Sequence, residues 1–353
     1  MLECRSPFLI GVFMSMSLEC AVDQRLVFAV CGYGYWGPNI VRNLKNIGCK
    51  VKYIFDGAVE RCDVAKEQYP DCITLTSLDP VIADDEVDAV VIVLPVSLHY
   101  EFAKRCLSSG KHVLVEKPMC NSSKDAEELI ALADSKDLVL MVDHTYVYSP
   151  FIEYLRDHYK NQHIMYLDSE RINLGKIQRD VNVVWDLAVH DLSIFDYICE
   201  SRPISLRAIG ESHTSSKLDD IVTIILHYPG DAIANIRVSW ISPVKSRRLI
   251  IGGDSDMAVF DDTLATDKIR IYDSRIIDNA DSGVILCEAG ESYSPKIESE
   301  EVLSLMLSDF AHSIESGSRP RSDSSMGLRV VRLIEAIQIS LSNGGSEVEL
   351  NDQ

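Results

Sequence analysis

The sequence predicts an α/β fold, with an N-terminal doubly wound Rossmann domain followed by an α+β domain that contains a large, mostly antiparallel sheet. The length of 353 residues suits two domains of about 150 residues each. Short apolar runs alternate with helical stretches up to about residue 143, and runs of alternating polarity dominate after residue 200. We therefore expect an N-terminal extension over 1–23, an NAD-binding Rossmann domain over 24–145, and a substrate-binding and oligomerisation domain over 146–353.

The first half contains five short β-rich runs that are almost continuously apolar, as parallel strands covered on both faces are. They span residues 26–31, 51–56, 87–95, 111–118 and 138–143. Segments with helical periodicity separate them, over 37–48, 58–69, 97–110 and 122–135. Gly48 and Gly110 lie where two of these helices should end.

The pattern changes after Tyr146, where a long helix over 184–200 precedes a series of alternating runs. The runs span 204–213, 220–228, 232–240, 247–253, 257–262 and 268–273. Pro229-Gly230 lies between the second and third runs, as in a hairpin turn. Two helices over 306–317 and 326–341 follow. So few helices leave one sheet face for a partner subunit, which predicts a homodimer or homotetramer.

Charge, hydropathy and cysteine spacing argue against several classes of function. Lys and Arg number 34 against 54 Asp and Glu, which gives a formal net charge of -20 and predicts repulsion of nucleic acids. No apolar run reaches the roughly 18–20 residues that cross a bilayer, and the apolar stretch over 8–14 makes a poor signal peptide. The ten cysteines show no zinc spacing, so we expect no metal and a reducing, cytoplasmic location.

The first chemical motif, AVCGYGYWGPN, follows a predicted strand and opens a helix. Its three glycines suit a tight turn, a close approach of pyrophosphate, and close packing of helix on strand. Asp56 closes the next strand, where its carboxylate would accept the adenosine ribose hydroxyls and disfavour a 2′-phosphate, so NAD is expected over NADP. Three turn glycines and an ordinary strand-end carboxylate are the alternative. The expected cofactor residues here are Gly32, Gly34, Tyr35, Trp36, Gly37 and Asp56.

The second motif, KHVLVEKPM, places Glu116-Lys117-Pro118 at the carboxyl end of a strand, where open α/β sheets bind ligands. A lysine held there can stabilise negative charge on a substrate oxygen. Pro95 and His99 follow the preceding strand and are expected, with Glu116 and Lys117, to contact the cofactor. A solvated rim lysine and a structural histidine in a first helical turn are the alternatives.

The third motif, NVVWDLAVHDLSIFDYI, places Asp186 and His190 four residues apart, and hence on one face of a helix. The imidazole can accept a hydroxyl proton near neutral pH, and the carboxylate can orient it. A buried structural pair is the alternative. Asp191 lies off this face and is expected to be structural.

Together these motifs contain the parts of a hydride transfer, and from Leu26 onward the chain resembles the Gfo/Idh/MocA family of NAD(P)-dependent sugar and polyol dehydrogenases. The resemblance implies that Lys117, Asp186 and His190 form a catalytic triad with His190 as the base. The family often has glycines before the aspartate, whereas this chain has Asp-Val-Asn-Val over 180–183.

The segments GYGYWGPNIVRN, DHTYVYSP and RPRSDSSMGLRVVRLIEA resemble the branch that oxidises nucleotide-linked amino sugars, and UDP-N-acetylglucosamine 3-dehydrogenases most of all. That likeness implies a 3-keto sugar made for a partner aminotransferase in glycan or lipid A precursor synthesis. Two alternatives stay open: a dehydrogenase of a UDP-N-acetylglucosaminuronate or a free polyol, and a non-catalytic NAD-binding sensor or scaffold.

A nucleotide sugar brings about two negative charges and therefore needs local cations. The candidates are Arg171, Lys176, Arg179, Lys245, Arg247 and Arg248. Ordinary surface charge is the alternative. Tyr146 and Tyr148 are expected to stack on sugar or uracil, although a core or hinge role fits them equally well.

Overall fold

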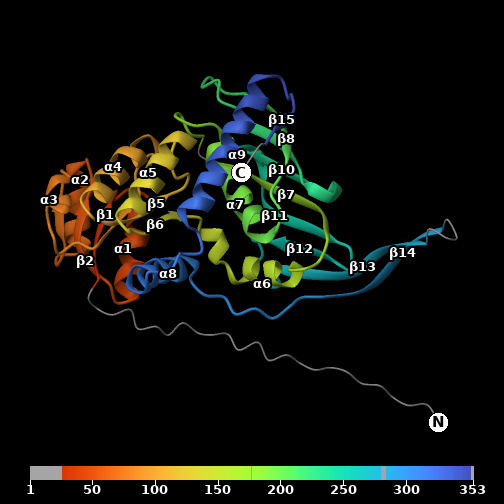
Figure 1. The fold of residues 1–353 in the computed structure, drawn as a ribbon, viewed down its shortest axis with the longest axis horizontal. Helices are drawn as coiled ribbons and strands as arrows, with labels where there is room; N and C mark the ends of the chain where they lie inside the picture. Colours follow the sequence, from red (N-terminus) through yellow and green to blue (C-terminus); the bar gives the residue numbers. More distant parts are fainter. Residues whose placement is uncertain (1–25, 176, 280–283, 351–353) are drawn as a thin grey trace, which may run out of the picture.

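The computed structural model describes residues 26–175, 177–279 and 284–350, so the expected extension over 1–23 lies outside the described residues. The described chain forms two sheets (Figure 1). One is parallel, with the strand order β3-β2-β1-β4-β5-β6, and the other has the order β14-β13-β12-β11-β7-β10-β9-β8-β15. The predicted α/β class, with its two kinds of sheet, is confirmed.

The first sheet has the doubly wound arrangement that its apolar runs predict. Its strands are β1 (Val27–Cys31), β2 (Lys50–Phe55), β3 (Ile73–Leu75), β4 (Ala89–Ile92), β5 (His112–Glu116) and β6 (Leu140–Asp143). Its helices are α1 (Gly37–Asn46), α2 (Val59–Gln68), α3 (Asp79–Ile82), α4 (Val96–Ser108) and α5 (Ser123–Ser135). Separate apolar clusters cover the two faces. The strand order reverses between β1 and β4, and the carboxyl ends of the strands there open a crevice for ligands.

The second sheet is antiparallel except where β7 runs parallel to β10. Its strands are β7 (Ile164–Leu174), β8 (Ser205–Glu211), β9 (Ile221–His227), β10 (Ile233–Ser239), β11 (Ile241–Gly253), β12 (Met257–Asp261), β13 (Ile269–Asn279), β14 (Val284–Tyr293) and β15 (Val348–Glu349). The short turn η3 (Pro229–Asp231) joins β9 to β10, which confirms the predicted hairpin.

The remaining helices pack against one or the other of the two sheets. They are η1 (Thr145–Tyr148), α6 (Pro150–Tyr159), η2 (Val184–Ala188), α7 (Val189–Ile198), α8 (Val302–Ser316) and α9 (Ser324–Ser342). Apolar residues of α6, α7 and α9 pack against one face of the second sheet. No helix in the described part of the chain has the length and apolar character to cross a membrane.

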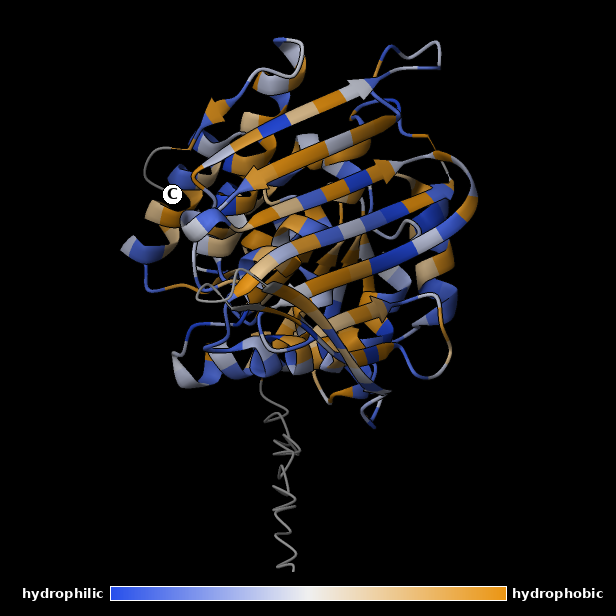
Figure 2. Cartoon of the chain, turned by 90° about the vertical axis from the view of Figure 1, so that its right-hand side faces the viewer, coloured by the Kyte–Doolittle hydropathy of each residue, from blue (hydrophilic) through white to orange (hydrophobic). Residues whose placement is uncertain are grey.

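The opposite face of the second sheet is turned to the viewer in Figure 2, where polar and apolar residues alternate along the strands. Ile209, Thr223 and Arg237 lie in register on three neighbouring strands, and each is exposed. Polar and apolar residues alternate on this face, which does not test the expected homo-oligomer, so the oligomer stays a prediction.

Helix α8 returns the chain to the first sheet. It lies in the range that the sequence assigns to the second domain, yet Leu303, Met306 and Phe310 pack into an apolar cluster of the first sheet. The Phe310 ring lies edge-on to Phe28 of β1, with 6.0 Å between the centroids. The chain therefore returns to the Rossmann sheet after the second sheet, and helix α8 covers part of one of its faces.

Candidate active site

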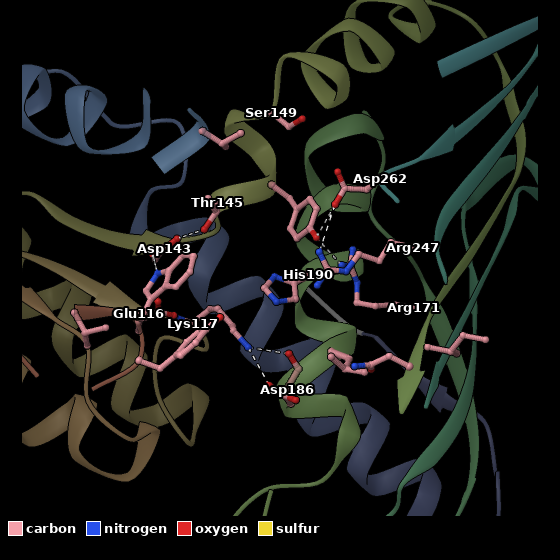
Figure 3. Close-up of a pocket in the computed structure, with 18 of the residues that line it drawn as sticks. Glu116, Lys117, Asp143, Thr145, Ser149, Arg171, Asp186, His190, Arg247 and Asp262 are labelled. Atoms are coloured by element: carbon pink, nitrogen blue, oxygen red, sulfur yellow. Dashed lines mark hydrogen bonds and ion pairs between the residues drawn. The ribbon is translucent and has the colours of Figure 1, made fainter. Parts of the chain in front are cut away.

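A cavity of about 730 Å³ lies where the carboxyl ends of β4, β5 and β6 face the second sheet (Figure 3). Its wall on the Rossmann side includes Tyr35, Trp36, Val93, Leu94, Glu116 and Asp143. Its opposite wall includes Tyr146, Arg171, Asn173, Ser246, Arg247 and Asp262. Lys117, Asp186 and His190 also line the cavity. Such a volume suits a small organic ligand, and its lining comes from both halves of the chain.

The glycine loop fits a dinucleotide. Gly32 has a φ of 109°, and a Cβ there would lie 2.2 Å from the Val93 carbonyl oxygen. A Cβ on Gly37 would lie 2.2 Å from the Gly32 oxygen, whereas a Cβ on Gly34 would have no neighbour closer than 3.6 Å. The N-cap residue Trp36 makes no side-chain hydrogen bond to α1, and the amides of Asn39 and Ile40 bond to its carbonyl oxygen. Because Pro38 has no amide hydrogen, the Gly37 amide is the one that the first turn offers to a phosphate.

Asp56 ends β2 beside this loop and is buried. Its Oδ2 accepts hydrogen bonds from the backbone amide of Tyr33 at 2.8 Å and from Arg61 at 3.3 Å, and its Oδ1 accepts one from Ala58 at 2.9 Å. Arg61 lies five residues after Asp56 in the sequence and was not predicted to lie near this carboxylate. An exposed guanidinium at this carboxylate could accept a 2′-phosphate, so Asp56 alone does not decide between NAD and NADP.

Lys117 follows β5 and reaches across the cavity to Asp186. Its Nζ donates to the Asp186 main-chain oxygen at 2.8 Å and lies 3.4 Å from Oδ1 (Figure 3). The indole Nε1 of Trp240 donates to Asp186 Oδ2 at 3.0 Å. One carboxylate oxygen of Asp186 therefore lies next to the lysine ammonium, and the other accepts a hydrogen bond from the tryptophan.

Within the described residues, no hydrogen bond joins Asp186 to His190, and His190 Nδ1 has no partner. In this structure the Asp186 carboxylate contacts Lys117 and Trp240, and the prediction that Asp186 orients the imidazole stays a prediction. A spacing of four residues aligns side chains in an α-helix. Residues 184–188 form a π-helical turn instead, and the Asp186 carboxylate in this turn contacts Lys117 and Trp240.

His190 is the second residue of the regular helix α7 and presents its ring to the cavity. The Tyr146 ring lies edge-on to it, with 5.2 Å between the centroids. Burial lowers the pKa of His190 well below its usual value, and the nearby charges of Lys117 and Arg171 lower it further. The ring is therefore neutral at neutral pH and can accept a proton.

Arg171 and Tyr146 organise the wall on the second sheet. The Arg171 guanidinium makes a two-pronged ion pair with Asp191, at 2.8 and 3.1 Å, and donates to the Tyr146 hydroxyl at 2.9 Å. Ser169 also donates to Asp191, at 2.7 Å, so this aspartate has the structural place expected of it. The Arg171 charge is thus balanced within the protein.

Asp262, just after β12, is a cavity residue that the sequence did not indicate. Its Oδ2 accepts from Tyr146 at 3.2 Å and lies 3.5 Å from Arg247, while its Oδ1 accepts from Lys268 at 2.8 Å. Two cations therefore share one carboxylate, which leaves an excess positive charge near Arg247. Asn173 and Ser246 complete this polar wall and were also not expected.

Several predicted site residues lie elsewhere. Tyr148 is buried and donates to Asp309 at 2.7 Å, so it has the core role that was its alternative and does not line the cavity. His99 is also buried, with its ring nitrogens 2.9 Å from the Pro118 oxygen and 2.7 Å from the Leu94 oxygen. Burial lowers the pKa of His99, which fits a role in supporting the wall.

Some of the other predicted site residues line the cavity and others do not. Pro95 caps α4 behind the wall. Arg179, Lys245 and Arg248 are exposed and do not line the cavity. Lys176 lies outside the described residues. Of the six expected cations, the structure brings only Arg171 and Arg247 to the cavity, within the part of the chain it describes.

A Rossmann sheet whose glycine loop opens beside a lysine, an aspartate and a histidine defines an oxidoreductase of the dinucleotide-binding class. Residues 26–144 match the oxidoreductase family model of the NAD-binding Rossmann fold, and residues 157–259 match the GFO/IDH/MocA C-terminal domain. The chain belongs to the Gfo/Idh/MocA family, as its motifs predict.

Two relatives of this chain are dehydrogenases named for a nucleotide sugar and for a polyol. The UDP-N-acetylglucosamine 3-dehydrogenase of Acidithiobacillus ferrooxidans is 33% identical over 200 residues, which are 56% of this chain and 62% of that enzyme. An NADP(+) scyllo-inositol 2-dehydrogenase of Bacillus subtilis is 34% identical over 84 residues, or 24% of each chain. A solved structure of the Acidithiobacillus enzyme matches with a TM-score of 0.78 at 25% identity, over 90% of this chain and 98% of that one. In sequence, the chain spans less than two thirds of the Acidithiobacillus enzyme.

Proposed function

We propose that the protein oxidises the C3 hydroxyl of UDP-N-acetylglucosamine with NAD and forms the 3-keto sugar. The observation that supports this most is the convergence of Lys117 and His190 on one cavity, beside a glycine loop that fits a dinucleotide. The likeness to the Acidithiobacillus enzyme supports the choice of substrate. An aminotransferase that consumes the ketone, in glycan or lipid A precursor synthesis, is part of the same proposal.

A bound nicotinamide dinucleotide supplies the hydride acceptor. The neutral ring of His190 removes the hydroxyl proton, and Lys117 stabilises the negative charge that develops on the oxygen. Asp186, fixed by Trp240, keeps the ammonium in place. The chain thus supplies the proton transfer and the electrostatic stabilisation.

The opposite wall suits a sugar that carries phosphate. Tyr146, Asn173 and Ser246 offer hydrogen bonds to hydroxyl groups. Arg247 is the better candidate for a phosphate than Arg171, because the Arg171 charge is balanced by Asp191 and Lys268 shares Asp262 with Arg247. Of the six expected cations, Arg247 is therefore the one that we propose for the phosphate.

Three further expectations belong to this proposal. We place the protein in the cytoplasm, where the unpaired cysteines of its described residues fit a reducing environment. We also propose a homodimer or homotetramer through the open face of the second sheet, and sedimentation as a monomer at micromolar concentration would contradict it. NADP is the second candidate cofactor, and the specific observation in its favour is Arg61 beside Asp56.

The experiment compares UDP-N-acetylglucosamine, its uronate and myo-inositol as substrates, each with NAD and with NADP, and follows nicotinamide reduction. We expect turnover with UDP-N-acetylglucosamine and NAD, and a loss of about 10²–10⁴-fold in His190→Gln, because positioned acid–base catalysis contributes that much. NAD affinity should be unchanged in the variant. Full turnover in His190→Gln would exclude the proposed base. Tight NAD binding without turnover on any of the sugars would favour the sensor alternative.

A further inference from the structure

Two carboxyl groups lie side by side on the Rossmann wall of the cavity. Glu116 ends β5 and Asp143 ends β6, and the two residues are neighbours in the register of these parallel strands. Both line the cavity (Figure 3). Within the described residues, neither is paired with an arginine or lysine in a salt bridge, so nothing of that kind balances two negative charges.

Glu116 and Asp143 are direct partners in the register of β5 and β6, so their side chains leave the same side of the sheet next to each other. Two neighbouring carboxylates repel each other, so one member of such a pair keeps its proton. Donors reach three of the four oxygens: Trp36 Nε1 lies 3.5 Å from Asp143 Oδ2, Thr145 donates to Asp143 Oδ1, and the amide of Lys117 donates to Glu116 Oε2 at 2.9 Å. This donor arrangement suits a pair with one shared proton and one negative charge.

The surrounding charges agree with this arrangement. Burial raises the pKa of Glu116, and repulsion by Asp143 raises it further; burial also raises the pKa of Asp143. The nearest cation is Lys117, whose ammonium is already bound to Asp186. His144, which follows Asp143 in sequence, and His190, which lines the cavity, both have a lowered pKa and are neutral. The Rossmann side of the cavity therefore keeps one negative charge that no neighbouring group cancels.

We propose that Glu116 and Asp143 share one proton and act as a single negative charge that favours binding of the oxidised, cationic nicotinamide over the reduced, neutral one. The inference rests on the proposed dehydrogenase function, which requires the ring to lie beside the carbon whose oxygen Lys117 and His190 hold. Glu116 directly precedes that lysine, on the same wall as the glycine loop. A unit charge about 10 Å away at an effective dielectric of about 20 changes a binding constant by roughly tenfold.

The test measures the affinity of the full-length protein for NAD and for NADH without any sugar, and compares their ratio. Glu116→Gln and Asp143→Asn each leave one carboxylate, so both variants should keep the wild-type preference for NAD within about threefold. The double variant leaves none, so its preference should fall by about tenfold. As a matched control, Glu127→Gln with Glu128→Gln removes two charges from the surface of α5 and should leave the ratio unchanged.

An infrared spectrum tests the shared proton directly and needs no cofactor. The wild-type protein should show a protonated carboxyl band at neutral pH, and Glu116→Gln should lack it. This comparison decides the matter if the double variant does not fold. A wild-type spectrum without that band, a double variant with the wild-type ratio, or single variants as impaired as the double would overturn the proposal. If the affinity ratios and the infrared band are as expected but none of the sugars is oxidised, the proposal for the carboxyl pair stands and only the proposed substrate is wrong.

Discussion

Trp240 donates a hydrogen bond of 3.0 Å to Asp186, the residue whose carboxylate and carbonyl oxygens hold the Lys117 ammonium. The tryptophan follows β10 in the second sheet and is almost fully buried. The lysine follows β5 of the Rossmann sheet. Asp186 therefore connects the two halves of the molecule at the point where the reaction is proposed, and a buried ring fixes its position.

Removing this hydrogen bond should weaken catalysis without abolishing it. We expect Trp240→Phe to lower kcat by about tenfold, because a hydrogen bond to a charged group contributes about 1.5–3 kcal/mol and part of the fixation remains. Asp186→Asn should cost more, since it removes the charge beside Lys117. Turnover kinetics of both single variants and of the double variant form a cycle. Strictly additive effects would show that Trp240 does not act through Asp186.

The sequence indicated the residues whose chemistry is local and missed those that long-range pairing brings in. The glycine loop, Glu116-Lys117 and His190 all lie in contiguous motifs, and the structure gathers them at one cavity. Asp262 and Ser246 reach it only through the register of the second sheet. Arg171 and Arg247 were predicted as candidate cations, but their pairing across β7 and β11 was not, because no local pattern reveals it.

The same distinction explains the fold. The buried parallel strands were predicted because both of their faces are apolar, whereas β3 has only three residues and none of them is buried. Strand β7 lies in the middle of the second sheet but carries charged residues on alternating positions, including Asp168 and Glu170. Its central place comes from pairing with β10 and β11, so it was not predicted. The π-helical turn at Asp186 was likewise hidden by an ordinary helical pattern.

Two glycines of the loop should respond differently to the same substitution. Gly34→Ala should fold normally, because its Cβ meets nothing within 3.6 Å, yet bind NAD at least about tenfold more weakly, because the methyl group occupies the approach of the pyrophosphate. Gly37→Ala should be destabilised by about 2 kcal/mol or more, since its Cβ would lie 2.2 Å from a backbone oxygen. Urea denaturation and NAD titration measure both effects. Equal stability of the two variants would contradict the assigned roles.

The ion pair between Arg171 and Asp191 should matter for stability. Asp191→Asn leaves a buried guanidinium without its carboxylate, which costs about 3–5 kcal/mol in comparable pairs. Glu170→Gln is the matched control, because Glu170 lies on the same strand as Arg171 and forms an exposed ion pair with Arg237 of β10. Its loss should lower the free energy of unfolding by about 1 kcal/mol or less. Urea denaturation at pH 7 compares the two. A loss in Asp191→Asn no larger than the control would mean that the site tolerates the unpaired charge.

His144 should make the protein less stable in mild acid. Its ring is buried, neither ring nitrogen has a hydrogen-bond partner among the described residues, and burial together with Lys117 and Arg329 lowers its pKa to about 3. The unfolded chain takes up the proton at a pKa of about 6.5, so the folded state loses stability as the pH falls from there towards 3. Above that range the residue contributes nothing to the pH dependence.

The expected loss is up to about 1.4 kcal/mol for each pH unit below 6.5. Urea denaturation at pH 7 and pH 5 should therefore show a drop that is about 2 kcal/mol smaller in His144→Gln than in the wild-type protein. His163→Gln, at an exposed histidine, should keep the wild-type drop. Because the proteins share every other titrating group, those contributions cancel in the comparison. An equal drop in all three would show that His144 gains its proton in the folded state as easily as in the unfolded chain.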